Sequence, residues 1–156
     1  MSSESYKVDS NNIPDASNLK IGIVVSRWNH SITDNLLKGS IALLESKNTA
    51  PENIQIIYVP GSFELVFGAK TASKYNYDDI ICLGSVIKGE TEHFHYVCNA
   101  VSLGIKDLNI TLKTPVIFGV LTDDNEQQSI DRSGGKHGNK GVEAAITGIK
   151  MAYLNK

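Results

Sequence analysis

Four short apolar runs alternate along this chain with longer segments of helical periodicity, and this alternation limits the fold more than any other feature. The runs are rich in β-branched residues and occupy 19–27, 53–61, 78–86 and 114–122. Helices are predicted at 31–47, 62–76 and about 91–109, and the segment 125–156 predicts a helix, a glycine-rich break and a further helix. Nearly continuous apolar strands are typical of a parallel sheet buried on both faces. The order therefore predicts an α/β fold, with a four-stranded parallel sheet in a three-layer helix-sheet-helix arrangement.

The composition fits a single domain over 1–156, in which 1–18 form a polar N-terminal extension. Apolar residues make up 41% of the 156 residues, enough for one sizeable core, whereas two domains would each be small. The formal net charge is −2, and no segment gathers enough Lys and Arg to follow a nucleic-acid backbone or an anionic membrane surface. We expect neither nucleic acid nor membrane as a partner.

The two cysteines, Cys82 and Cys98, lie in apolar segments without a close-spaced motif, which favours reduced thiols over a disulfide. No run approaches the ~18 apolar residues of a membrane span. The N-terminus lacks the apolar region of a secretory signal. These features predict a cytoplasmic protein.

The residues that follow the predicted strands are the first place to look for a binding site, because ligands of parallel α/β sheets bind at the carboxyl ends of the strands. Here these segments are 26–29, 61–64, 85–93 and 121–123, and they bring aromatic, acidic, basic and glycine residues to one rim.

The third of these segments suggests a phosphate site. Gly84 and Gly89 have the spacing of a nucleotide-binding loop, but Glu90 and Thr91 follow where such a loop needs Lys and then Ser or Thr. A triphosphate site is therefore disfavoured. A glycine turn that leads into a helix N-terminus can instead hold a single phosphate. The alternative is that Thr91 only caps the helix.

Two histidines lie at the start of the same helix. His93 and His95 are two positions apart, so they point about 200° apart on a helix and are a poor pair of metal ligands. The positive end of the helix dipole favours a neutral imidazole, which suits acid/base chemistry at His93. His95, His30 and His137 are interpreted as partly exposed residues without a chemical role.

Two further features have both a structural and a functional interpretation. Trp28 directly follows the first strand and could stack on a planar ring or cover the end of the core. Arg132, Lys136 and Lys140 surround the glycine-rich break. An arginine suits a phosphate or carboxylate, although such clusters are usually solvated loops.

Taken together and in order, five segments resemble the 6,7-dimethyl-8-ribityllumazine synthase family, the enzymes of the penultimate step of riboflavin synthesis. They are SRWN, PGSFEL, GSVIKGETEHFHYVCN, PVIFGVLT and DRSGGKHGNKGVEAA, and the resemblance covers about 19–154. It implies a flavodoxin-like fold and a transferase. The reaction would condense 5-amino-6-(D-ribitylamino)uracil with 3,4-dihydroxy-2-butanone 4-phosphate, release phosphate and water, and need no metal or organic cofactor.

The resemblance also implies roles for individual residues. His93 would be the proton donor, Arg132 would bind phosphate, and Phe118 would be the aromatic residue supplied to a neighbouring subunit. Substrate would contact a second group at the strand ends and around the break: Trp28 on the pyrimidine, Ser62, Phe63 and Glu64 on the ribityl chain and ring, the backbone of Ser85, Val86 and Ile87 on the pyrimidine edge, Glu90 and Thr91 in the phosphate loop, and Lys140 near the ribityl group.

Three departures from the family pattern leave every reactive group in place. Trp28 replaces a usual Phe, Leu65 and Val66 replace a commoner Ile-Pro, and Gly134 and Gly135 loosen the usual loop. The chemistry agrees with the resemblance, because a carbonyl-amine condensation needs proton transfer but no strong protein nucleophile.

The resemblance implies a homo-oligomer, either a pentamer or an icosahedral shell of twelve pentamers, with riboflavin synthase as a possible partner protein. A short break without an insertion favours the shell, and Tyr6–Val8 could pair as an edge strand with an adjacent subunit. Two alternatives stay open, a non-catalytic lumazine- or flavin-binding relative and an FMN carrier. The carrier would be expected to have a Ser/Thr/Gly-rich loop after the first strand, where this chain has Arg27, Trp28 and Asn29.

Overall fold

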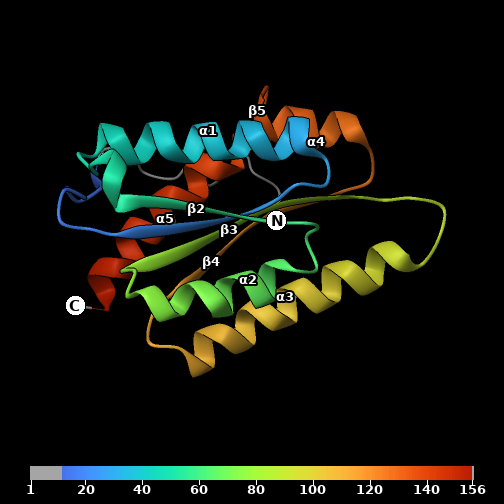
Figure 1. The fold of residues 1–156 in the computed structure, drawn as a ribbon. Helices are drawn as coiled ribbons and strands as arrows, with labels where there is room; N and C mark the ends of the chain where they lie inside the picture. Colours follow the sequence, from blue (N-terminus) through green and yellow to red (C-terminus); the bar gives the residue numbers. More distant parts are fainter. Residues whose placement is uncertain (1–11, 156) are drawn as a thin grey trace.

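Four parallel strands form the central sheet, and they lie in the order β2-β1-β3-β4 (Figure 1). They are β1 (Ile21–Ser26), β2 (Ile54–Val59), β3 (Asp79–Ile87) and β4 (Val116–Asp123). The structure is a computed structural model that describes residues 12–155. Each pair of neighbouring strands in this sheet is parallel, which confirms the predicted sheet. The edge strand expected at Tyr6–Val8 lies outside the described residues.

Helices cover both faces of the sheet and complete the predicted three layers (Figure 1). On one face lie α1 (His30–Ser46), α4 (Glu126–Arg132) and α5 (Lys140–Leu154), and on the other lie α2 (Leu65–Ala72) and α3 (His93–Thr111). Two short 3-10 turns, η2 (Pro51–Asn53) and η3 (Ser73–Tyr75), precede β2 and follow α2. Within 12–155, no helix is long and apolar enough to cross a membrane.

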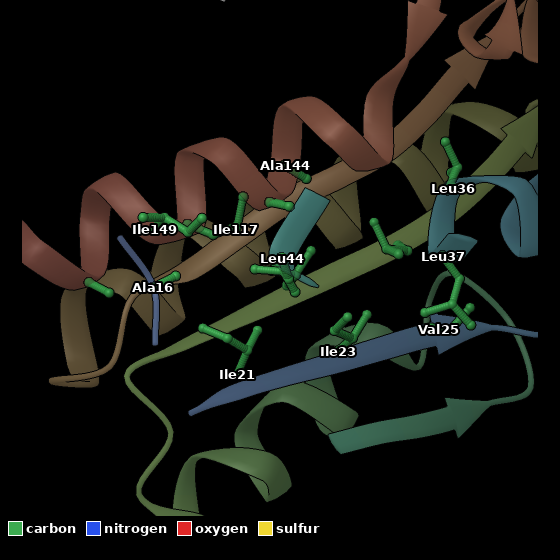
Figure 2. Close-up of a cluster of buried hydrophobic side chains, with 14 of the residues drawn as sticks. Ala16, Ile21, Ile23, Val25, Leu36, Leu37, Leu44, Ile117, Ala144 and Ile149 are labelled. Atoms are coloured by element: carbon green, nitrogen blue, oxygen red, sulfur yellow. The ribbon is translucent and has the colours of Figure 1, made fainter. Parts of the chain in front are cut away.

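The core consists of two clusters of buried side chains, one on each face of the sheet. On β1, Ile21, Ile23 and Val25 pack toward α1 and α5, as Figure 2 shows for the first cluster. Val24 points to the opposite face and packs with residues of α2 and α3. All four side chains are completely buried. Burial of an aliphatic side chain contributes about 1.5–3 kcal/mol to the stability of the fold. Because both faces of β1 are buried, apolar residues are favoured on both, and the strand shows no polar alternation.

The glycine-rich break contains a small antiparallel hairpin that the sequence did not predict. Its strands are β5 (Ser133–Gly135) and β6 (Gly138–Asn139). Gly134 and Gly138 have positive φ angles of 119° and 81°, which residues with side chains rarely adopt. Asn139 then caps α5, since its Oδ1 accepts from the backbone N–H of Gly141 at 2.8 Å. The strands are too short to leave a pattern in the sequence.

Candidate active site

A cleft of about 700 Å³ lies where β1, β2 and β3 end. This volume suits a small organic ligand, since such pockets usually measure roughly 300–1,000 Å³. The lining residues come from the three turns after these strands and from the start of α3. They are Trp28, Asn29, Gly61, Ser62, Phe63, Glu64, Ser85, Val86, Ile87, Gly89, Thr91, His93, Phe94 and Val97.

Backbone hydrogen bonds hold the turn after β1 against the turn after β2. The N–H of Arg27 donates to the carbonyl of Val59 at 2.9 Å, and that of Trp28 donates to Pro60 at 3.1 Å. Trp28 is 72% exposed, so its ring does not cover the core. The indole surface is instead free to stack on a planar ligand at the edge of the cleft.

The turn after β2 is a tight bend that presents Phe63 and Glu64, both exposed, to the cleft. It is closed by hydrogen bonds from Glu64 N–H to the Gly61 carbonyl and from Leu65 N–H to the Ser62 carbonyl, both 3.2 Å. Within the described part of the chain, the buried Ser62 Oγ has no hydrogen-bond partner. A buried hydroxyl without a partner is destabilising, and a bound ligand can supply that partner.

Gly84 on β3 allows the turn after β2 to approach the sheet closely. A Cβ atom at this position would lie 2.7 Å from Ser62 Oγ, closer than packed atoms can come. Beyond Gly84, the segment Ser85–Ile87 forms the floor of the cleft as the last part of β3. The side-chain amide of Asn29 donates to the carbonyl of Ser85 at 3.1 Å and fixes this segment to the turn after β1.

His93 lies at the first position of α3 and lines the cleft, whereas His95 does not. The Thr91 hydroxyl accepts a long hydrogen bond, 3.4 Å, from the backbone N–H of His93. Thr91 therefore contributes to capping and also faces the cleft. His95 packs edge-on against Phe94, with ring centroids 5.2 Å apart. Across residues 12–155, no group of three or more His, Cys, Asp and Glu side chains is arranged to hold a metal ion.

The two thiols lie outside the cleft lining. Burial raises the pKa of the Cys82 thiol to about 12. Burial also raises the pKa of Cys98, which is half-buried on α3. Both are free thiols, as the sequence predicted, and neither is placed as a nucleophile for this site.

A second polar cluster joins α4 to α5, and Glu143 is at its centre. The Glu143 carboxylate lies 3.7 Å from Arg132 Nη2 and 3.0 Å from Lys140 Nζ. All three side chains are about one-third exposed or less. Glu143 is therefore a shared counter-ion that holds the two cations near each other, and none of the three residues lines the cleft described above.

Comparison with known proteins agrees with this architecture. The family model of 6,7-dimethyl-8-ribityllumazine synthase matches residues 18–156. The chain belongs to the 6,7-dimethyl-8-ribityllumazine synthase family. A protein of this name from Parabacteroides distasonis is 54% identical over 148 residues, which cover 94% of this chain and 92% of that protein. One from Porphyromonas gingivalis is 46% identical over 149 residues, which cover 95% of this chain and 92% of that protein. The predicted lumazine synthase family membership is confirmed, and with it the expectation of an enzyme.

Most residues to which the lumazine synthase resemblance assigned substrate contacts lie in one cleft. These are Trp28, Ser62, Phe63, Glu64, Ser85, Val86, Ile87, Thr91 and His93. Glu90 is exposed beside the cleft without lining it, and Phe118, Arg132 and Lys140 also lie outside it. Phe118 is on the edge strand β4, and Arg132 and Lys140 are in the Glu143 cluster. One chain therefore brings together only part of the predicted site.

The sequence interpretation assigned no role to Asn29, Phe94, Val97 or Glu143. Phe94 and Val97 follow His93 by one and four positions on α3, so helical periodicity could have placed Val97 beside His93. Asn29 has a left-handed backbone, with φ of 56°, which turns the chain from β1 into α1. Helical spacing could have suggested the pair of Glu143 with Lys140, three positions apart on α5, but its contact with Arg132 spans the hairpin and left no local signal.

Proposed function

We propose that this chain catalyses the condensation of 5-amino-6-(D-ribitylamino)uracil with 3,4-dihydroxy-2-butanone 4-phosphate to 6,7-dimethyl-8-ribityllumazine. Phosphate and water are released. The observation that carries the proposal is the convergence of an exposed aromatic ring, an ordered strand end and a helix-start histidine on one cleft: Trp28, Ser85–Ile87 and His93. Family membership supports the same reaction.

In this proposal the pyrimidine stacks on Trp28, and the backbone of Ser85, Val86 and Ile87 recognises its edge. Ser62, Phe63 and Glu64 bind the ribityl chain and ring, where the unpartnered Ser62 hydroxyl provides a hydrogen-bonding group. The pyrimidine ring and the ribityl chain then bind to different residues that line the cleft.

The phosphorylated substrate binds at the start of α3, near Glu90 and Thr91, because the positive end of a helix dipole favours an anion. The amine of the pyrimidine attacks the carbonyl of the butanone, and proton transfer by His93 assists loss of water. Elimination of phosphate and ring closure need further proton transfers, for which a single positioned imidazole suffices. The remaining acceleration comes from holding the two substrates together.

Arg132, Lys140 and Phe118 act in this proposal from a neighbouring subunit, because they do not line the cleft of their own chain. The functional unit is accordingly a homo-oligomer, a pentamer that further assembles into an icosahedral shell. Riboflavin synthase, which uses the product, is a candidate partner protein.

The test is to mix the purified protein with both substrates and follow the absorbance of the lumazine product. A mixture without protein measures the spontaneous reaction. Product formation well above that background supports the proposal. Absence of acceleration would leave a lumazine- or flavin-binding relative, and fluorescence of Trp28, the one tryptophan in the sequence, would then report whether the product binds.

A further inference from the structure

A line of buried polar side chains runs behind the floor of the cleft, from β3 to α4 and then to the end of β4. Ser85 Oγ lies 3.4 Å from Ser129 Oγ, and Ser129 Oγ donates to Asp123 Oδ2 at 2.7 Å. Their exposed fractions are 1%, 0% and 8%, respectively. Hydrogen bonds that are shielded from water in this way rigidify the elements that they join.

The direction of these hydrogen bonds follows from the number of available protons. A serine hydroxyl has one hydrogen, and that of Ser129 is directed to the Asp123 carboxylate. The contact between the two serines can then form only if Ser85 is the donor. The order of donation is therefore from Ser85 to Ser129 to Asp123, and it ends on a group that accepts strongly.

The same residues fix the end of β3 through the backbone. The carbonyl of Asp123 accepts from the N–H of Lys88 at 2.9 Å, and Ile87 pairs with Asp123 in the sheet. On the opposite side of the strand end, Asn29 donates to the Ser85 carbonyl. The segment Ser85–Ile87 is thus held by the Ser85 side chain, by the Ser85 carbonyl and by its pairing with β4.

Helix α4 provides a fixed support for this line, because other contacts hold it in place. Asn125 caps its start by accepting from Gln128 N–H at 3.1 Å. Near its end, the Asp131 carbonyl accepts from His137 N–H at 2.8 Å. Loss of the Ser129 hydroxyl would therefore release the end of β3 more than it would move α4.

We infer that Ser129 and Asp123 are positioning residues that hold Ser85–Ile87 in the geometry needed to recognise the pyrimidine substrate. This inference rests on the proposed function. Neither residue lines the cleft, so each acts through Ser85 and not by touching substrate.

The central variant is Ser129→Ala, which removes the middle hydroxyl without adding volume. The contact between Ser85 and Ser129 is long at 3.4 Å, so it should lie at the weak end for a hydrogen bond, and KM and Kd for the pyrimidine should rise by about three- to fivefold. The KM for the phosphorylated substrate and kcat should change less than about twofold. The split between the two KM values distinguishes positioning from general loss of structure.

Asp123 provides a conservative rescue. Asp123→Asn retains an oxygen that accepts from Ser129 and should bind the pyrimidine nearly as the wild type does, whereas Asp123→Ala should weaken it as Ser129→Ala does. The double variant, Ser129→Ala with Asp123→Ala, should bind the pyrimidine about as well as the weaker-binding of the two single variants. Both substitutions break the same line of hydrogen bonds. Additive losses, or equal losses for Asn and Ala, would overturn the inference.

Thr49→Val is the matched control, because Thr49 is also buried, at 2% exposed, and its hydroxyl donates to the Ala16 carbonyl at 3.3 Å. It follows the C-terminal end of α1, away from the cleft lining. It should lower the melting temperature without changing either KM. An unchanged pyrimidine KM in folded Ser129→Ala, or the same change in Thr49→Val, would refute positioning. If Ser129→Ala does not fold, the two Asp123 variants decide.

The proposed function fails separately if the wild type binds the pyrimidine but makes no lumazine. The Kd values from Trp28 fluorescence then still decide the positioning role. A wild type that does not bind the pyrimidine overturns both.

Discussion

Asp79 carries a carboxyl group into the apolar interior at the start of β3. It is completely buried, and neither carboxyl oxygen has a hydrogen-bond partner among the described residues. Burial, with a smaller contribution from the charge of Asp78, raises the pKa of Asp79 well above its ordinary value. Gly148 on α5 makes room for this group, since a Cβ there would lie 1.8 Å from Asp79 Oδ2. The folded protein therefore favours the neutral carboxyl.

Asp79→Asn should stabilise the protein at neutral pH. Because the pKa of Asp79 is raised in the folded state, Asp79 costs no stability below its unfolded pKa, near 4, where the carboxyl is neutral in both states. Stability is lost as pH rises toward the folded pKa. Asn keeps the shape and cannot ionise, so at about pH 7.5 the Asn variant should be the more stable protein. Denaturant unfolding at about pH 4 and 7.5 measures the difference, which should shrink at the lower pH. A constant difference would contradict this account.

His93 is exposed at the start of α3 and lines the cleft, which fits proton transfer to a bound substrate. His93→Ala should lower kcat by up to ~10²-fold, with less effect on binding, and the reactivity of the substrates themselves can reduce this loss. His95→Ala is the matched control, because His95 lies on the same turn but does not line the cleft. Single-turnover rates separate the chemical step from binding. Equal rates for wild type and His93→Ala would remove His93 from the mechanism.

At the level of helices and strands, the sequence predicted the order of elements and the rim where the turns meet. Long apolar runs and helical periodicity are local signals, so they placed β1, β3 and α3 within a few residues. The hairpin of β5 and β6 was missed because two- and three-residue strands have no period. The contact of Ser85 with Ser129, 44 positions apart, could not be inferred because it depends on how α4 packs on the sheet.

Helix α4 ends at Arg132, whose guanidinium shares Glu143 with Lys140. Arg132→Lys retains the charge but loses the planar fork that binds two phosphate oxygens. The phosphorylated substrate should bind about tenfold more weakly, whereas the pyrimidine should bind as before. The control is Arg27→Lys, which makes the same substitution at the other arginine. Arg27 stacks on Tyr58 at 4.4 Å and lies outside the cleft lining. Calorimetry with each ligand tests the difference. Equal weakening of both ligands by Arg132→Lys would argue against a phosphate-specific role.

On the scale of the whole molecule, helix α3 carries an exposed apolar surface. On α3, Tyr96, Leu103 and Ile110 follow one another at intervals of seven residues and are 74%, 57% and 72% exposed. Seven-residue spacing places them along one side of the helix. Large exposed apolar surfaces mark sites of protein association. Together with the position of Arg132 outside the cleft, this surface favours sites shared between subunits.

Leu103→Asp should therefore separate the assembly into smaller species and reduce activity, because an aspartate in an apolar contact must give up its hydration. Leu154→Asp is a control at an exposed leucine at the end of α5. Light scattering at several concentrations gives the masses. The wild type should form a shell, or at least a pentamer, and Leu154→Asp should match it. A pentamer alone would exclude only the shell. A fully active monomer, or full activity in dissociated Leu103→Asp, would show that one chain holds a complete site.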